Sequence, residues 1–146
     1  MRETKFRGNR LDNEQWFYGS LVYGFSEASG YKGIGAYLTA YEPENNSFTT
    51  YEIDPQTVGQ YTGLKGKNGV EIYEGDIVLS KRFDIIDIKD GKNETKFPTK
   101  KCIVSWSDET AGFYLKGIKG SLEDCLDNRM KLEIIGNIHE NPELIK

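Results

Sequence analysis

The sequence predicts a mainly β protein, and three features of its composition support this fold class. Glycine is frequent, with 16 residues, whereas proline is rare, with 4. Frequent glycine between short runs of Tyr, Phe, Val, Ile and Thr is typical of strands joined by tight turns. Aromatic residues make up 12% of the 146 residues, and because each one buries a large area, they can form a packed core.

The N-terminal part of the chain is predicted to consist of strands separated by polar turns. A first strand is expected at Lys5–Arg7, before a turn rich in Asn, Asp and Gly. Gln15–Tyr23 is dense in aromatic residues and β-formers and forms a second strand candidate, and the Ser- and Gly-rich segment Gly24–Gly33 is expected to be a loop. The next hairpin candidate consists of Ile34–Tyr41 and Ser47–Ile53, with Glu42–Asn46 as its turn.

A further hairpin is expected in the middle of the chain. Its strands are Val58–Tyr61 and Val70–Tyr73, and the dipeptide Asn68–Gly69 between them is a strong hairpin signal. We expect Lys65–Asn68 to form the tip, with a purely structural role. Gly69 is expected at a positive φ, which is costly for β-branched residues.

The C-terminal half contains more strand candidates and one exposed arm. Residues 89–101 are polar and rich in lysine, which is typical of an exposed arm or loop. The expected strands, in chain order, are Ile77–Leu79, the apolar run Phe83–Ile88, Cys102–Trp106, Phe113–Leu115 and Leu132–Ile138.

One short helix is predicted at Ser121–Asp127. Ser121 can cap its N-terminus, and Asp124, three residues later, completes a pair that resembles a capping box. Leu122, Cys125 and Leu126 follow the i, i+3, i+4 spacing that places apolar side chains on one helix face.

The net charge and the N-terminal sequence argue against DNA or a membrane as a partner and against export from the cell. The net charge of −4 and pI of about 5.1 mean that the overall field does not attract DNA or anionic membranes. No apolar run follows the charges of Met1–Arg7, as it would in a signal peptide, and no stretch approaches the ~20 apolar residues of a membrane helix. We therefore expect a cytoplasmic protein with no membrane partner, in which Cys102 and Cys125 are free thiols.

The residues that most often carry catalysis are scarce. The single histidine, His139, lies beside Asn137 and Glu140 near the C-terminus, which favours an exposed structural residue over a catalytic one. Gly66–Lys67 does not form a phosphate-binding P-loop, because Tyr61 occupies the position of its first glycine and Asn68 follows the lysine. The GXXG pattern at residues 63–66 is flanked by strand-like sequence, so a hairpin turn is favoured over a nucleic-acid clamp.

Three carboxylates form the best candidate for a metal site. Glu71, Glu74 and Asp76 surround a turn and could hold a hard cation. In the alternative interpretation, Glu71 points out of a strand and the Asp76 carboxylate accepts backbone N–H groups at the turn. The structural interpretation is favoured, so no catalytic, cofactor-binding or metal-binding residue and no cofactor is predicted. A metal-dependent enzyme that uses Glu71, Glu74 and Asp76 remains the alternative function, and convergence of the three carboxylates is its test.

Two groups of side chains could instead bind a macromolecule. The lysines of the arm are interleaved with acidic residues, which favours a solvated arm, although lysine is also what phosphate contacts require. Most of the aromatic residues that alternate with polar residues are expected in the core, while one or two exposed rings could form a binding surface. These residues are Lys89, Lys92, Lys96, Lys100 and Lys101 for the arm, and Trp16, Tyr18, Trp106 and Tyr114 for the aromatic group.

Four stretches of the sequence match a known family. They are Lys5–Gly8, the long segment VGQYTGLKGKNGVEIYEGDIV at Val58–Val78, Val104–Trp106 with Gly112–Tyr114, and LEIIGNIHENP at Leu132–Pro142. The set resembles the YopX family of phage and prophage proteins over nearly the whole chain, with the weakest match at residues 24–41 and 81–101. The resemblance implies a small, mainly β fold and supplies no reaction, cofactor or catalytic residue. In the matched stretches, Gly63, Gly69 and Gly75 suit positive φ or crowded backbone.

Together, these observations predict a single compact unit, residues 1–146, with an N-terminal β lobe at 1–57 and a β-barrel lobe at 58–146. The second lobe is expected to be a small, bent, SH3-like barrel with one short helix, because a strand at Gly75–Val78 precedes a long excursion, a hairpin, a helical turn and a last strand. The predicted function is a phage- or prophage-encoded accessory protein that binds a protein or a nucleic acid without catalysis. A phage or host protein is the favoured partner, nucleic acid is less favoured, and a homo-oligomer is compatible with the sequence.

Overall fold

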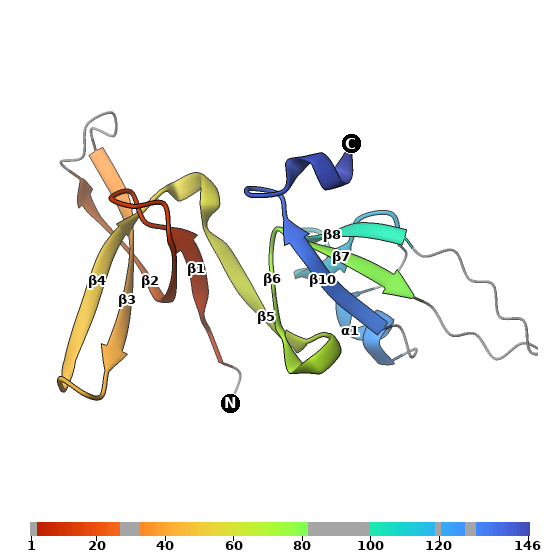
Figure 1. Cartoon of the computed structure of the whole chain (residues 1–146), viewed down its shortest axis with the longest axis horizontal. Coiled ribbons are helices and arrows are strands. Elements are labelled where there is room, and N and C mark those ends of the chain that lie inside the picture. The colour runs from red at the N-terminus through yellow and green to blue at the C-terminus, as the bar shows by residue number, and fades with distance from the viewer. Residues whose placement is uncertain (1–2, 27–32, 82–99, 119–120, 128–130) are drawn as a thin grey trace, which may run out of the picture. The chain divides into compact units, whose positions relative to one another are not determined.

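The computed structural model describes residues 3–26, 33–81, 100–118, 121–127 and 131–146 (Figure 1). The chain divides into two compact units, Met1–Gly63 and Leu64–Lys146. The division between the units falls inside strand β5, and the lobe boundary at residue 57 stays a prediction.

The N-terminal unit is an antiparallel sheet with the strand order β4-β3-β2-β1-β5 (Figure 1). The long strands β2 and β3 pair from Ser20–Thr39 to Ser26–Gly33, and β3 pairs with β4 over the whole length of β4. Its elements are β1 (Phe6–Asn9), β2 (Trp16–Ser26), β3 (Gly33–Glu42), β4 (Ser47–Ile53), the 3₁₀ turn η1 (Pro55–Thr57) and β5 (Gly59–Lys65).

The sheet of the N-terminal unit curls until the end of β4 returns to the end of β1. Arg10 and Ile53 form a bridge, and the Asp54 N–H donates to the Asn9 carbonyl at 2.8 Å. Ile53 is fully buried, and a Cβ placed on Gly8 would lie 2.1 Å from its Cγ2 atom. Only glycine at position 8 therefore allows β1 to lie beneath this side chain.

The C-terminal unit contains a four-stranded antiparallel sheet with the order β10-β7-β8-β9 (Figure 1). One face of this sheet carries the core, in which Val78, Val104, Leu115 and Leu132 are each at most 1% exposed. The elements are the 3₁₀ turn η2 (Lys67–Gly69), β6 (Glu71–Tyr73), β7 (Asp76–Lys81), β8 (Lys100–Ser107), β9 (Gly112–Leu115), α1 (Leu122–Asp127), β10 (Lys131–Asn137) and the 3₁₀ turn η3 (Pro142–Ile145).

The predicted short helix is confirmed as α1, and it covers the core face of the C-terminal sheet. Leu122 and Cys125, one turn apart, are 1% and 3% exposed and belong to the core cluster. The Cys125 N–H donates to the Ser121 carbonyl at 3.1 Å, so Ser121 begins the helix as expected. The Asp124 side chain lies outside the described part, and so does its proposed pairing with Ser121.

The mainly β fold, the additional N-terminal sheet and the single short helix are confirmed, whereas the described strands form open sheets and no closed barrel. The SH3-like character of the second lobe stays a prediction. The apolar run at 83–88 and the arm up to residue 99 lie outside the described residues.

Two predicted loop boundaries are wrong, because cross-strand pairing outweighs the weak strand propensity of glycine. β2 continues through Gly24–Ser26, which pairs with Gly33–Gly35. Likewise, β5 continues through Gly63 to Lys65, past the predicted strand end at Tyr61 and into the expected hairpin tip.

The Asn68–Gly69 signal is confirmed as a tight hairpin turn between β5 and β6. Asn68 has φ 61° and Gly69 has φ 73°, so both central residues are left-handed. The Val70 N–H donates to the Lys67 carbonyl at 3.4 Å, and the Gly66 N–H donates to the Val70 carbonyl at 2.8 Å. This pattern is the primed turn whose twist matches antiparallel strands.

Replacing Gly69 by Val should destabilise the protein by about 1–2 kcal/mol, the usual cost of a left-handed conformation for a residue with a Cβ. A Cβ on Gly69 would have no atom within 4 Å, so the effect reports backbone strain rather than a steric clash. Gly69→Asn is the matched control, because Asn tolerates this region, and it should retain most of the stability. Urea unfolding measures both variants, and equal stability of Gly69→Val and wild type would contradict the assignment.

Both cysteines should be unreactive in the folded protein and reactive once it is unfolded. Cys102 and Cys125 are free and 3% exposed. Burial raises the pKa of the Cys102 thiol, although a Ser80 hydrogen bond and the Lys100 charge oppose this shift, and a protonated thiol is a poor nucleophile. Titration with a thiol reagent, without reductant, should detect two thiols per chain in denaturant and react slowly without it. Detection of no thiol in denaturant would show a disulfide.

Candidate functional site

The three carboxylates of the predicted metal site are not brought together. Asp76 is 1% exposed, and its Oδ2 accepts the Tyr73 N–H at 2.8 Å. Glu71 accepts the Tyr73 hydroxyl at 2.9 Å, and Glu74 is half-buried. Across the described residues, no three His, Cys, Asp or Glu side chains form a group that could hold a metal ion. The alternative function, a metal-dependent enzyme, required these three carboxylates to converge, and they do not.

The turn itself explains why Asp76 is buried. Gly75 between the two strands has φ +88°, which allows β6 to reverse into β7. The Gly75 N–H donates to the Val104 carbonyl, and the Gly75 carbonyl accepts the Ile138 N–H, both at 2.9 Å. The Asp76 carboxylate completes this arrangement by pairing the Tyr73 N–H, which a buried turn cannot leave without a partner.

The single histidine lies in a turn that asparagine side chains hold. His139 is exposed, and Asn137 Oδ1 accepts its backbone N–H at 3.0 Å and that of Glu140 at 2.9 Å. Asn141 Oδ1 accepts the Asn137 N–H at 3.3 Å. A Cβ on Gly136 would lie 2.5 Å from this same oxygen. The segment therefore forms a turn, held by asparagine side chains, that leads into η3.

One face of the N-terminal sheet exposes a row of aromatic side chains. Tyr41 and Phe48 are direct cross-strand partners with ring centroids 5.3 Å apart. Tyr18 is two residues before Ser20, whose partner Thr39 is two residues before Tyr41, so strand alternation places Tyr18 and Tyr41 on the same face. Tyr18, Tyr41 and Phe48 are 45%, 51% and 70% exposed. We call these three residues the aromatic face.

Within the described residues, the cations of the N-terminal unit lie against its own aromatic rings. Lys5 lies over Tyr61, Arg7 over Trp16 and Arg10 over Tyr51, at 5.1, 4.8 and 3.5 Å from the ring centroids. Arg10 also pairs with Asp12, which raises the Arg10 pKa and lowers the Asp12 pKa, because each charge stabilises the other. Residues 1–63 contain five Lys or Arg against eight Asp or Glu, a net charge of −3. This unit therefore offers few free positive charges.

Of the four aromatic residues considered from the sequence, two are exposed. Tyr18 belongs to the aromatic face, and Trp106, which is 39% exposed, packs edge-on against Phe113 and donates its Nε1–H to Asp108 at 2.8 Å. Trp16 and Tyr114 are half-buried. Tyr41 and Phe48 were not singled out from the sequence, because neither GIGAYLTAYE in β3 nor SFTTYEI in β4 alternates regularly between aromatic and polar residues.

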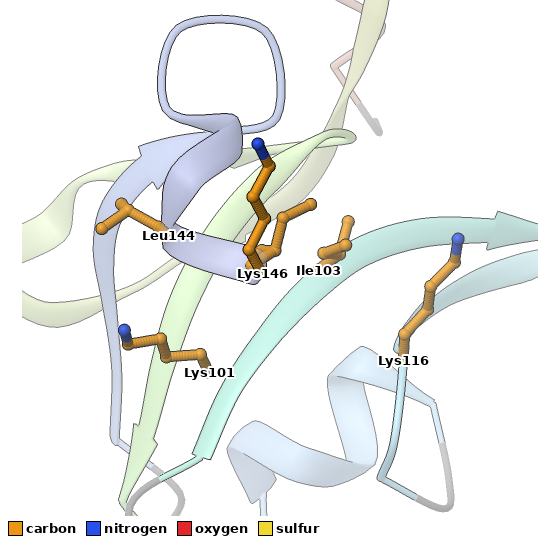
Figure 2. A pocket seen from close by; sticks show the side chains of 6 residues that line it. Lys101, Ile103, Lys116, Leu144 and Lys146 are labelled. Atoms are coloured by element: carbon orange, nitrogen blue, oxygen red, sulfur yellow. The ribbon is translucent and has the colours of Figure 1, made fainter.

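A cationic pocket of about 310 Å³ lies on the C-terminal unit (Figure 2). Half of its lining is lysine and half is aliphatic, and the two kinds come from three separate elements. The lining residues are Lys101 and Ile103 of β8, Lys116 after β9, and Leu144, Ile145 and Lys146 at η3. Only Lys101 belongs to the lysine-rich arm singled out in the sequence. Lys100 is described and lies outside the pocket, whereas Lys89, Lys92 and Lys96 lie outside the described residues.

The remaining pocket residues carried no signal in the sequence. Lys116 follows β9, and Lys146 is thirty residues further along the chain. Their proximity depends on the pairing of β8 with β9 and on where the turn at Asn137–Asn141 directs η3. Pairing and turn direction are tertiary properties, which single-residue patterns do not encode.

Comparisons with known proteins identify a family and a fold. A family model described as YopX protein matches residues 5–146. A search of curated proteins finds no match. Among solved structures, the chain is similar to the crystal structure of protein EF1440 from Enterococcus faecalis, with 23% identity, a TM-score of 0.56 and complete coverage of both chains. That likeness supports the fold alone. Over the described residues, no helix is long and apolar enough to cross a membrane.

Replacing Asp76 by Ala should lower the free energy of unfolding by about 1–3 kcal/mol, because it removes the buried carboxylate that accepts the Tyr73 N–H. Glu74→Ala is the matched control in the same turn and should change stability by no more than about 0.5 kcal/mol. Adding Ca²⁺, Mg²⁺ or Mn²⁺ should leave the melting temperature of the wild type unchanged. A metal-dependent rise in melting temperature that Asp76→Ala abolishes would contradict the structural role.

Proposed function

Because the chain belongs to the YopX family, we propose that it is a phage- or prophage-encoded accessory protein that binds a protein partner without catalysing a reaction. The resemblance of the sequence to phage and prophage proteins supports the origin, and a bacterial cytoplasm is the corresponding compartment. Binding without catalysis is supported by the use of Asp76 and of the His139 segment within structural turns.

The observation that carries the proposal is the aromatic face. Large aromatic side chains are enriched among the residues that dominate protein–protein binding energy. Tyr18, Tyr41 and Phe48 form one row across three hydrogen-bonded strands, so their backbone positions are set before any partner arrives. A preordered surface loses less conformational entropy on binding than a mobile one. The row is therefore a suitable anchor for a partner.

The charges around the aromatic face favour a protein over a nucleic acid. Stacking platforms for single strands combine aromatic rings with cations that follow the phosphates. Here the described cations of the unit are held over aromatic rings, and residues 1–63 have a net charge of −3. A nucleic acid would therefore gain stacking but meet net electrostatic repulsion, whereas a protein partner needs no such neutralisation.

A photo-crosslinking amino acid at position 48 should capture one specific protein in the bacterial host, and the same label at Val70 should not. Val70 is 51% exposed and belongs to the C-terminal unit. The adduct should disappear in Tyr18→Ser/Tyr41→Ser, because both rings of the anchor are lost. It should persist in Tyr23→Ser/Phe25→Ser, which removes two exposed aromatics from the opposite face of β2.

The captured protein, once purified, should bind the wild type and bind Phe48→Ser at least about tenfold more weakly by calorimetry, as expected for loss of a hot-spot side chain. An adduct that both double variants retain would overturn the proposal. So would an adduct formed only with a second copy of this chain or only with nucleic acid.

A further inference from the structure

The cationic pocket on the C-terminal unit is independent of the aromatic face, and its chemistry points to a different kind of ligand. All six lining residues belong to the unit Leu64–Lys146. Figure 2 shows Ile103 and Lys146 between the side chains of Lys101 and Lys116. Lysine side chains from three segments therefore lie around a small aliphatic surface, with their Nζ atoms directed to different sides.

Strand alternation explains how lysine and apolar side chains come to share this face. Cys102 points into the core and is 3% exposed, so its neighbours Lys101 and Ile103 lie on the opposite face of β8. Ile103 is the cross-strand partner of Ile77 of β7, which is fully buried. We call the aliphatic side chains of the pocket its apolar floor, and on this side the floor borders the buried Ile77. The Lys116 N–H donates to the Ile103 carbonyl at 3.0 Å, which fixes the second lysine beside this floor.

The third side of the pocket comes from η3, which the asparagine turn positions. The Asn141 N–H donates to the Asn137 carbonyl at 2.9 Å, and the Leu144 N–H donates to the Asn141 carbonyl at 3.1 Å. These bonds carry Leu144, Ile145 and Lys146 to the pocket. The turn that contains His139 thus contributes to building this pocket.

The side chains that line the pocket are either positively charged or aliphatic. No acidic side chain lines it, and within the described residues Lys101, Lys116 and Lys146 make no ion pair. An anion bound beside one of these lysines would gain a favourable charge interaction. An ammonium group is also a good donor to phosphate or carboxylate oxygens.

The aliphatic lining and the volume of the pocket indicate which kind of anion fits it. A bare inorganic anion would leave Ile103, Leu144 and Ile145 in contact with water, whereas an apolar group attached to the anion would cover them. The volume of about 310 Å³ lies at the lower end of the range for small-molecule pockets. We propose that this pocket binds a small organic anion, a phosphate or carboxylate group carried on an apolar body, with the lysines holding the anion and the aliphatic side chains holding the body.

Backbone NMR titration of the full chain tests this proposal with four probes: phenyl phosphate, benzoate, inorganic phosphate and phenol. Phenyl phosphate or benzoate should give saturable shifts confined to residues around 101–103, 116 and 144–146. Inorganic phosphate and phenol should bind more weakly, because phosphate lacks the apolar body and phenol lacks the anionic group. The stronger of phenyl phosphate and benzoate identifies the anion, and added salt should weaken its binding.

Two double variants separate a built site from general charge attraction. Lys101→Gln/Lys116→Gln should lower the affinity for the better probe by at least about tenfold, as expected when charged hydrogen bonds are lost. Lys65→Gln/Lys100→Gln removes the same charge from exposed positions outside the pocket, Lys100 being on the opposite face of β8. This control should retain the affinity, and Leu144→Ala should weaken phenyl phosphate but not inorganic phosphate.

Three results would overturn the proposal. They are the absence of saturable shifts with every probe, shifts spread over the whole chain, and equal weakening by the pocket and control double variants. None of them concerns the aromatic face, so the proposed function would stand or fall separately.

Discussion

Both units depend on glycine at points where backbone and side chains approach too closely for a Cβ. Gly8 lies beneath Ile53 in the N-terminal unit, and Gly66 lies against the Leu132 carbonyl in the C-terminal unit, where an added Cβ would be 2.6 Å from the oxygen. Gly136 similarly makes room for the Asn141 side chain. Protein interiors pack at nearly crystalline density, so such contacts cannot be relieved by small shifts. Three features therefore require glycine: the curl of the N-terminal sheet at Gly8, the β5–β6 hairpin at Gly66, and the turn before η3 at Gly136.

The matched stretches of the family are largely made of this turn chemistry. In the segment at 58–78, Asn68 and Gly69 form the hairpin turn, Gly75 has a positive φ, and Asp76 pairs a buried N–H. In the segment at 132–142, Asn137 pairs two N–H groups of its own turn. These residues form turns and so determine the fold, and fold alone does not determine function. The function of this protein is therefore expected to depend on surface residues outside these turns.

The two proposed surfaces illustrate this division. The aromatic face follows from a two-residue strand period applied to β2, β3 and β4, which places Tyr18, Tyr41 and Phe48 on the side opposite buried Leu38 and Ile53. The cationic pocket follows from the same period in β8, combined with the placement of η3 by Asn137 and Asn141. In each case a hydrogen-bonded frame sets the backbone positions of exposed side chains, and exposed side chains are the ones that recognition uses.

The sequence by itself determined the features that depend on neighbouring residues. These are the mainly β class, the Asn68–Gly69 turn and the short amphipathic helix at Leu122–Asp127. Local patterns suffice for them because a turn or a helix face is defined within a few residues. The same patterns misplaced the ends of β2 and β5, where pairing with a distant strand overrides glycine propensity.

Only the tertiary structure decided which side chains share a surface. It separated Glu71, Glu74 and Asp76, which are close in sequence, because the turn directs Asp76 inward to the Tyr73 N–H. It also joined Lys101, Lys116 and Lys146, which are distant in sequence, through strand pairing and the turn at Asn137. The physical reason is that a site depends on register and turn direction, which arise from contacts between segments that the chain itself keeps far apart.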